Sequence, residues 1–147
     1  MDHLLDDVEM ARWVAWKRAA DTVMRNVVDE ISTATGLSGA GFAVLTRVVE
    51  EGGGRLRQQR LSDDLGWERS RLSRQVGRMA DRGLVVREGS SAERLVAATP
   101  KGRRVAAQAR VAHAAAVRRH LLEPVAPRGA AAFWRAVEAL GEPTAER

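Results

Sequence analysis

The stretch Leu65–Met79, LGWERSRLSRQVGRM, combines the pattern of a buried helix face with a basic polar side. Apolar residues recur in it at the three- and four-residue spacing of one helix face. They are Leu72, Val76 and Met79, and Ala80 directly after the stretch extends the same face. On a helical wheel the polar sector contains no acidic residue and consists of small residues and donors; its members are Ser70, Ser73, Arg74 and Gly77. The stretch therefore predicts a helix whose outer face suits an anionic partner.

The composition of this polar sector favours DNA over water as its partner. A solvated helix face usually mixes Glu with Lys, which pair at i,i+4, and this one does not. Arginine can form two hydrogen bonds to a guanine edge or a phosphate, and serine is short enough to allow close approach. Arg69 falls at the angle of the apolar stripe, but in the first turn its long side chain can extend past the core. The alternative is an arginine-rich face exposed to solvent.

The positive charge of the chain is concentrated in its middle. The 147 residues have a net charge of +5 and are enough for one domain, with or without appended helices. Residues 54–104 contain 12 Arg and one Lys against six acidic residues, so the remainder of the chain is slightly acidic. Local basicity of this kind favours nucleic acid first and an anionic membrane second.

Several classes of function are disfavoured by what the sequence lacks. There is no Cys, which removes disulfides, thiolate zinc sites and Cys nucleophiles. No phosphate-binding glycine motif is present, and His3, His113 and His120 do not have metal-ligand spacing. We therefore expect neither an enzyme nor a metal or other cofactor. The N-terminal segment is acidic without a signal-peptide core, and no apolar run is long enough to span a bilayer, so we expect a cytoplasmic protein without a membrane partner.

The order of the predicted elements is that of a winged helix. The chain is predicted to be mainly α-helical with one small β-hairpin. Val-containing stretches flank a Gly-Ser-Ser turn within Leu84–Thr99, which predicts the hairpin, and Thr99-Pro100 is a typical helix start. The predicted helices lie at residues 3–33, 39–51 after an N-cap at Ser38, 58–65, 68–82, 100–123 and 127–141. A helix-turn-helix followed by a two-stranded wing is a DNA-binding architecture.

The segments LSGAGFAVL, LSDDLGWERSRLSRQVGRMADRGLVVRE and LVAATPKGRR together resemble the MarR family of bacterial transcriptional regulators, in particular its actinobacterial branch. The resemblance covers residues 37–104 in motif detail. It implies a homodimer that binds a palindromic operator, with a recognition helix at 68–82 and a wing at 85–98. It also implies a DNA-binding region at 37–99 and a dimerisation region formed by 1–36 and 100–147. By position, the groove-reading residues of the family are matched by Arg69, Ser70, Ser73 and Arg74.

Two positions depart from the pattern of the family. Wings of this family usually contain Asp-x-Arg or Asp-Arg-Arg at the tip, whereas the tip here reads Ser90-Ser91-Ala92-Glu93-Arg94. We expect Arg94 to be the residue that enters the minor groove, with Glu93 as its partner. Arg57 stands where a Ser or Thr cap is common before the short helix, and we expect it to reach a DNA phosphate. Arg71 and Arg78 lie further round the recognition helix and are assigned to phosphate or to intramolecular pairing.

The outer helices, which are those predicted at residues 3–33, 100–123 and 127–141, are expected to form the dimer and to bind an effector. Their apolar residues include candidates for a core between subunits, namely Leu121, Leu122, Phe133, Trp134, Val137 and Leu140; packing within one chain is the alternative. The family often binds small amphipathic or phenolic molecules that lower DNA affinity. The candidate lining residues are Trp13, Trp16, His113 and His120, although a Trp on such a helix is commonly part of a core.

The sequence thus predicts a sequence-specific regulator that binds double-stranded DNA. The resemblance to the family further implies that it acts as a repressor and is released by a small-molecule effector. The main alternative is an architectural winged-helix protein that binds nucleic acid without sequence preference, which would depend on salt but hardly on sequence. A winged helix used only for protein contacts is a further alternative, and it predicts no binding to duplex DNA at low salt.

Overall fold

The computed structural model describes residues 4–90 and 93–143. In chain order its elements are α1 (Asp7–Thr35), α2 (Gly39–Thr46), the π-helix η1 (Arg47–Glu51), β1 (Arg55–Arg57), α3 (Gln58–Leu65), α4 (Arg69–Asp81), β2 (Val85–Glu88), β3 (Leu95–Ala98), α5 (Pro100–Val117), the π-helix η3 (Arg118–Leu122), α6 (Glu123–Val125), the 3₁₀ turn η4 (Ala126–Arg128) and α7 (Ala130–Gly141). They form two compact units, one of Met1–Val27 with Ala115–Arg147 and the other of Val28–Ala114.

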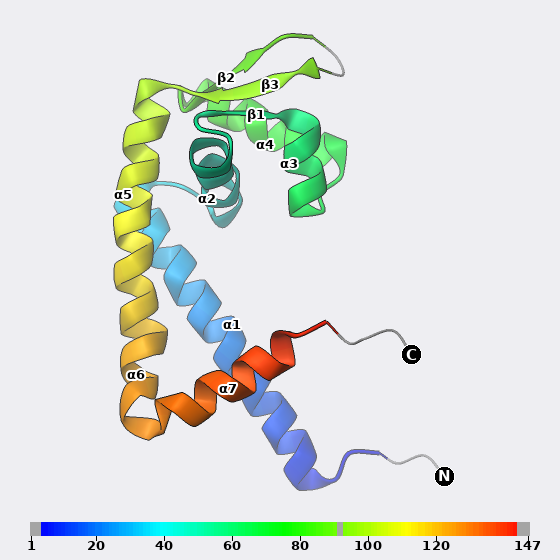
Figure 1. Cartoon of the computed structure of the whole chain (residues 1–147), viewed down its shortest axis with the longest axis vertical. Coiled ribbons are helices and arrows are strands. Elements are labelled where there is room, and N and C mark those ends of the chain that lie inside the picture. The colour runs from blue at the N-terminus through cyan, green and yellow to red at the C-terminus, as the bar shows by residue number, and fades with distance from the viewer. Residues whose placement is uncertain (1–3, 91–92, 144–147) are drawn as a thin grey trace. The chain divides into compact units, whose positions relative to one another are not determined.

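The unit Val28–Ala114 is a winged helix, as predicted. Its three-stranded antiparallel sheet has the order β1-β3-β2, and α2, α3 and α4 lie on one side of it (Figure 1). The hairpin of β2 and β3 pairs Val85 with Ala98 and Glu88 with Leu95. Strand β1 was not predicted. It has only three residues, two of them Arg, and it becomes a strand because it pairs with β3, Arg55 opposite Ala97.

Local side-chain chemistry fixes the helix boundaries that the sequence predicted. The Ser38 hydroxyl accepts from the Gly41 amide at 3.0 Å and caps α2. Thr99 does the same for α5, since its Oγ1 accepts from the Gly102 amide at 3.0 Å. Helix α3 spans the predicted residues and ends at Gly66, whose φ of +63° is the left-handed conformation that glycine adopts most easily.

The outer helices differ from the prediction at their ends. Helix α1 begins at Asp7, and its predicted first residue, His3, lies outside the described residues. The long helix that starts at Pro100 widens to a π-helix at Arg118–Leu122 instead of continuing as a regular α-helix to residue 123. Helix α7 starts at Ala130 rather than residue 127, because the preceding residues form a 3₁₀ turn.

The core of the winged-helix unit is formed by aliphatic residues of its helices and its hairpin. The side chains with the least exposure come from α1, α2, η1, α3, α4, α5 and the sheet, and from Leu37 and Leu84 in the connecting loops. The largest of them are Ile31, Leu37, Leu45, Leu61, Leu72, Met79 and Leu84. This core fixes α4 between α3 and the wing, so the outward face of α4 is set by its apolar stripe.

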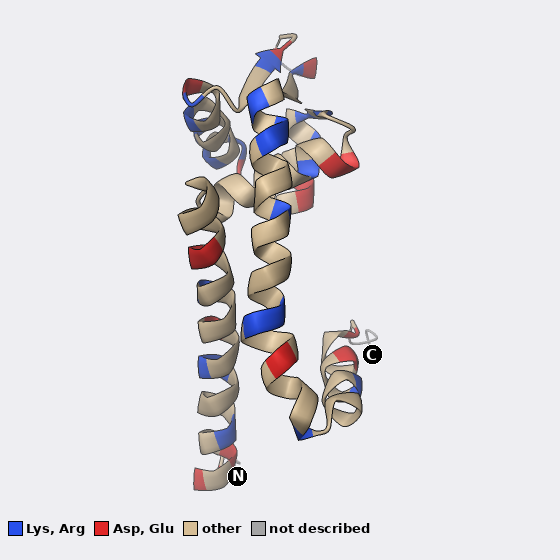
Figure 2. Cartoon of the chain, turned by 90° about the vertical axis from the view of Figure 1, so that its left-hand side faces the viewer, with Lys and Arg blue, Asp and Glu red and all other residues tan. Residues whose placement is uncertain are grey.

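The unit of the outer helices buries little of its apolar surface. Of its described residues, only Val27 and Ala116 are buried. Large apolar side chains are exposed on several helices, including Trp13 at 51%, Leu122 at 42% and Leu140 at 74%. Much of α1 is uncharged in the view of Figure 2. No helix in the described part of the chain has both the length and the hydrophobicity needed to cross a membrane.

Candidate nucleic-acid interface

Helix α4 has the two faces that its sequence predicted. Leu72, Val76 and Met79 are at most 2% exposed and form the buried stripe. Gln75 is also buried, with 8% exposure, and its Oε1 accepts from Arg78 Nη2 at 3.4 Å. The burial of this glutamine was not predicted, because its wheel position is at the edge of the apolar arc.

The residues on the outward face of the first turns of α4 point to solvent. Arg69, Ser70 and Arg74 are all exposed. None of the three side chains has a hydrogen-bond or ion-pair partner among residues 4–90 and 93–143. Helix α4 contains no acidic residue before Asp81. Their donors are therefore available to an anionic ligand without breaking an intramolecular bond.

Arg71 and Arg78 form intramolecular contacts, one of the two roles that the sequence predicted for them. The Arg71 guanidinium carbon lies 4.1 Å from the centre of the Trp67 ring, which is a cation–π contact. Arg78 donates to the Gln75 side chain, as described above.

Ser73 contacts the wing, which the sequence did not predict. It is half-buried, and Arg87 of β2 donates from Nη2 to both its carbonyl oxygen, at 2.5 Å, and its hydroxyl oxygen, at 3.2 Å. Its groove-reading role remains a prediction, but its hydroxyl is already engaged. The residue that sequence reasoning missed here is Arg87.

The other two predicted DNA-binding residues flank the start of α3. Arg57 occupies the N-cap position, is exposed, and its side chain does not cap the helix. The Arg94 carbonyl accepts from the Gln58 amide at 2.9 Å, while the Arg94 Nε is buried and has no hydrogen-bond partner among the residues that the structure describes. Ser91 and Ala92 of the predicted wing tip lie outside the described residues, so minor-groove entry by Arg94 remains a prediction.

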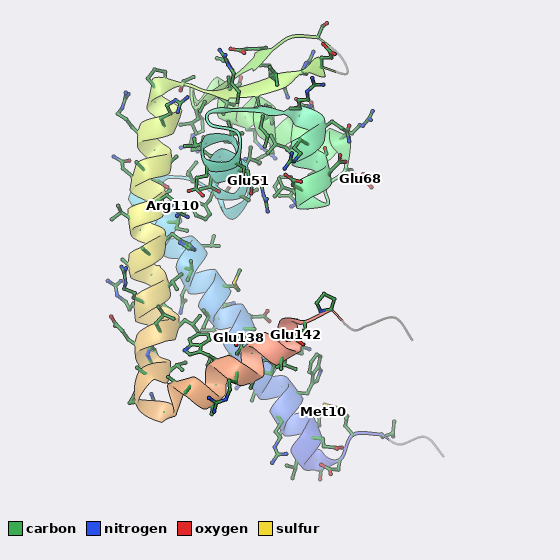
Figure 3. The ribbon with its side chains drawn as sticks, in the orientation of Figure 1. Met10, Glu51, Glu68, Arg110, Glu138 and Glu142 are labelled. Carbon is green, nitrogen blue, oxygen red and sulfur yellow. The ribbon has the colours of Figure 1, made fainter. Side chains whose placement is uncertain are left out.

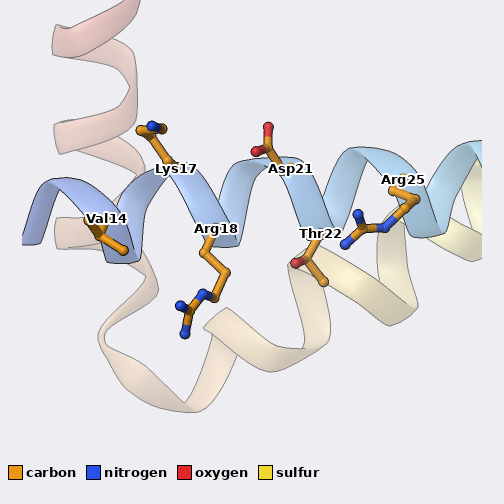
Figure 4. Close-up of a pocket in the computed structure, with 6 residues that line it drawn as sticks. All are labelled: Val14, Lys17, Arg18, Asp21, Thr22 and Arg25. Atoms are coloured by element: carbon orange, nitrogen blue, oxygen red, sulfur yellow. The ribbon is translucent and has the colours of Figure 1, made fainter. Parts of the chain in front are cut away.

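The predicted effector residues lie in different units. Trp13 and Trp16 are about half-exposed on α1, and Lys17 Nζ lies 5.7 Å from the centre of the Trp13 ring. His113 belongs to the winged-helix unit and stacks on Phe42, with ring centroids 5.4 Å apart. Neither Trp is among the residues that line the shallow pocket on α1 (Figure 4), which are Val14, Lys17, Arg18, Asp21, Thr22 and Arg25.

The candidate residues for a core between subunits are partly or fully exposed. Phe133 and Trp134 are half-exposed and meet edge to face, with centroids 4.8 Å apart. Leu121 and Val137 are also only half-buried, while Leu122 and Leu140 are exposed. None of this set is buried within its own chain, which leaves it free to be covered by another.

Replacing Gly77 of α4 with alanine is expected to raise the free energy of unfolding by about 0.5–1 kcal/mol, since glycine is a poor helix former. A Cβ at this position would meet only the Arg87 guanidinium nitrogens, at 3.9 and 4.0 Å. Urea denaturation followed by circular dichroism measures the change. A loss of stability would show that the internal packing requires a glycine at position 77. A gain would show that it does not, and close approach of a ligand to α4 would then explain the glycine.

Comparison with known proteins agrees with this architecture. A family model described as "Domain of unknown function (DUF7343)" matches residues 43–90, and a search of curated protein sequences found no match. AbsC, a MarR family transcriptional regulator from Streptomyces coelicolor, is similar in structure, with a TM-score of 0.79, 24% identity and 95% of each chain covered.

Two further solved structures are similar over nearly the whole chain. A second MarR family regulator from Streptomyces coelicolor, solved in complex with DNA, has a TM-score of 0.78 and 21% identity, covering 99% of this chain and 97% of that one. CouR from Rhodococcus jostii, a transcriptional repressor bound to p-coumaroyl-CoA, has a TM-score of 0.68 and 25% identity, covering 97% and 96%. The chain therefore has the winged-helix fold of MarR family transcriptional regulators, and none of the three is named an enzyme.

Proposed function

We propose that this protein is a transcriptional regulator that binds double-stranded DNA through α4 and its wing. The observation that supports this most strongly is the outward face of α4, where Arg69, Ser70 and Arg74 are exposed and have no side-chain partner in the described part of the chain. The helix has no acidic residue before Asp81. A helix of this kind fits the major groove and places its donors against base edges and phosphates.

The protein acts as a homodimer in this proposal and recognises a palindromic operator. One recognition helix reads only a few base pairs, so specificity requires two half-sites related by the symmetry of a dimer. The exposed apolar residues of the outer helices, among them Trp13, Leu122 and Leu140, support this proposal, because a second copy of the chain could cover them. Repression follows if the operator overlaps a promoter.

A small amphipathic or phenolic effector releases the protein from DNA in this proposal. The similar CouR structure is bound to p-coumaroyl-CoA, a ligand with a phenolic ring. Aromatic side chains on α1 and the stacked pair of Phe42 and His113 offer surfaces for such a ring.

Competition between duplexes tests the DNA-binding proposal directly. The protein is titrated with labelled fragments of the intergenic DNA adjoining its own gene, in the presence of excess random duplex at physiological salt. We expect the protein to bind at least one fragment about 10³-fold or more tightly than random duplex, so that this fragment stays bound in the competition. Equal competition by random duplex would favour an architectural protein, and no binding at low salt would favour a winged helix used for protein contacts.

A further inference from the structure

Arg87 lies on the wing and faces the recognition helix. In strand β2 successive side chains alternate between the two faces of the sheet, and Arg87 is on the same face as Val85, which is 1% exposed. Val86, on the other face, is 46% exposed. The strand therefore directs the guanidinium of Arg87 toward α4 rather than into open solvent.

The hydrogen bonds of Arg87 hold its guanidinium in one place and leave a donor free. Nη2 donates to the carbonyl and hydroxyl oxygens of Ser73, and Nε is buried with no partner in the described part of the chain. Nη1 has no partner among the described residues and, unlike Nε, is not enclosed. Because the guanidinium is planar and rigid, fixing Nη2 also fixes the direction in which Nη1 points.

The guanidinium of Arg87 lies over the half-buried flank of α4 that adjoins its outward face, at Ser73 and Gly77. An ideal Cβ built on Gly77 would be 3.9 Å from Nη1 and 4.0 Å from Nη2. Ser73 and Gly77 are one turn apart on the face that also contains Ser70 and Arg74. The wing thus adds a cation to the surface of the helix that is proposed to enter the major groove.

The charge of Arg87 is not neutralised by its acidic neighbour in the sequence. Glu88 pairs instead with Arg55 of β1, with Nε and Oε2 3.2 Å apart. Arg87 has no ion-pair partner among residues 4–90 and 93–143. A guanidinium that is held by neutral oxygens keeps its positive charge and can still attract a ligand anion.

We propose that Arg87 is a DNA-binding residue that takes a backbone phosphate at the junction of helix and wing, with Ser73 as its positioning residue. This rests on the proposed function. The major and minor grooves are separated by a sugar-phosphate backbone. When α4 occupies the major groove and the wing reaches the adjacent minor groove, a cation between them faces that backbone. Arg87 therefore contributes to affinity for every duplex and not to the choice of base.

The test is the salt dependence of binding by three variants of the full-length protein. Arg87→Met removes all donors and keeps the aliphatic length, Arg87→Lys keeps the charge, and Arg110→Met is the matched control. Arg110 lies on α5 (Figure 3), about 15 Å along the helix from its start, and pairs with Glu50 at 2.8 Å. The dissociation constant is measured between 50 and 300 mM salt on the duplex selected by the wild type and on a random duplex, with thermal unfolding of each variant.

We expect Arg87→Met to lower the slope of log K against log salt by about one for each copy bound, with equal weakening on both duplexes. Arg87→Lys retains a slope near that of the wild type, and Arg110→Met leaves slope and affinity unchanged. The proposal is wrong if folded Arg87→Met keeps the wild-type slope, if the loss falls on the selected duplex alone, or if Arg110→Met gives the same loss. If the wild type shows no preference for any duplex, the proposed function is wrong. The proposal for Arg87 can then still be judged, because a phosphate contact would still change the slope of log K against log salt.

Discussion

The Arg74→Ala variant is expected to lose its base preference at one position of each operator half-site, at a cost of about 1–3 kcal/mol per site. Arg74 is exposed on α4, diametrically opposite the buried stripe, and has no intramolecular partner among the described residues. A guanidinium in that position can donate two hydrogen bonds to one guanine edge. The measurement is the affinity of the variant for the selected operator and for its single-base substitutions, compared with the wild type.

Arg57→Ala is the matched control for this prediction. Arg57 is also an exposed arginine without a cap bond, but it stands at the start of α3. A phosphate contact from that position weakens binding to all sequences about equally and reduces the salt slope. If both variants lost affinity equally on every sequence, the assignment of Arg74 to the major groove would be wrong.

The Gly102→Ala variant is expected to lower the free energy of unfolding by about 3 kcal/mol. Gly102 is buried in the first turn of α5, and a Cβ there would lie 2.0 Å from the Leu84 carbonyl oxygen and 3.0 Å from its carbon. Because these are backbone atoms at the start of the wing, the clash with the added Cβ can be removed only if the chain itself shifts. The better helix propensity of alanine, about 1 kcal/mol, is too small to offset the clash.

The Gly77→Ala variant is the control for this second prediction. Both glycines are helical and lie in the winged-helix unit, but of the two only Gly102 would bring a Cβ against backbone, that of Leu84 before β2. In urea denaturation, the unfolding midpoint of Gly102→Ala should therefore lie below that of the wild type, and the midpoint of Gly77→Ala should lie above it. A shift of the same sign in both variants would contradict the close packing of α5 against Leu84.

The elements that the sequence predicted best are those with local determinants. Helix α3 is bounded by Gly66, and α2 and α5 begin at the hydroxyl caps Ser38 and Thr99. The spacing of Leu72, Val76 and Met79 alone fixes which side of α4 is buried. In each case the decisive interaction lies within about four residues of the chain, so a sequence pattern is enough to find it.

The features that were missed depend on contacts between distant segments. Strand β1 is three residues long and exists through its pairing with β3, some forty residues later. The bond from Arg87 to Ser73 joins the wing to α4 and depends on the register of β2. Alternation along β2 places Arg87 on the same face as Val85, but only the folded structure shows what that face meets. The same holds for the widening of the helix at Arg118–Leu122.

The most direct test of the central claim, that the outward face of α4 reads DNA sequence, is selection of duplexes by the wild-type protein from a random pool at physiological salt, followed by sequencing. A dimeric winged helix should enrich an inverted repeat whose half-sites are centred about 10–10.5 base pairs apart or a multiple of this. It should bind that repeat at least about 10³-fold more tightly than the starting pool. Recovery of a pool with no enriched sequence, from a protein that still binds DNA, would contradict the account.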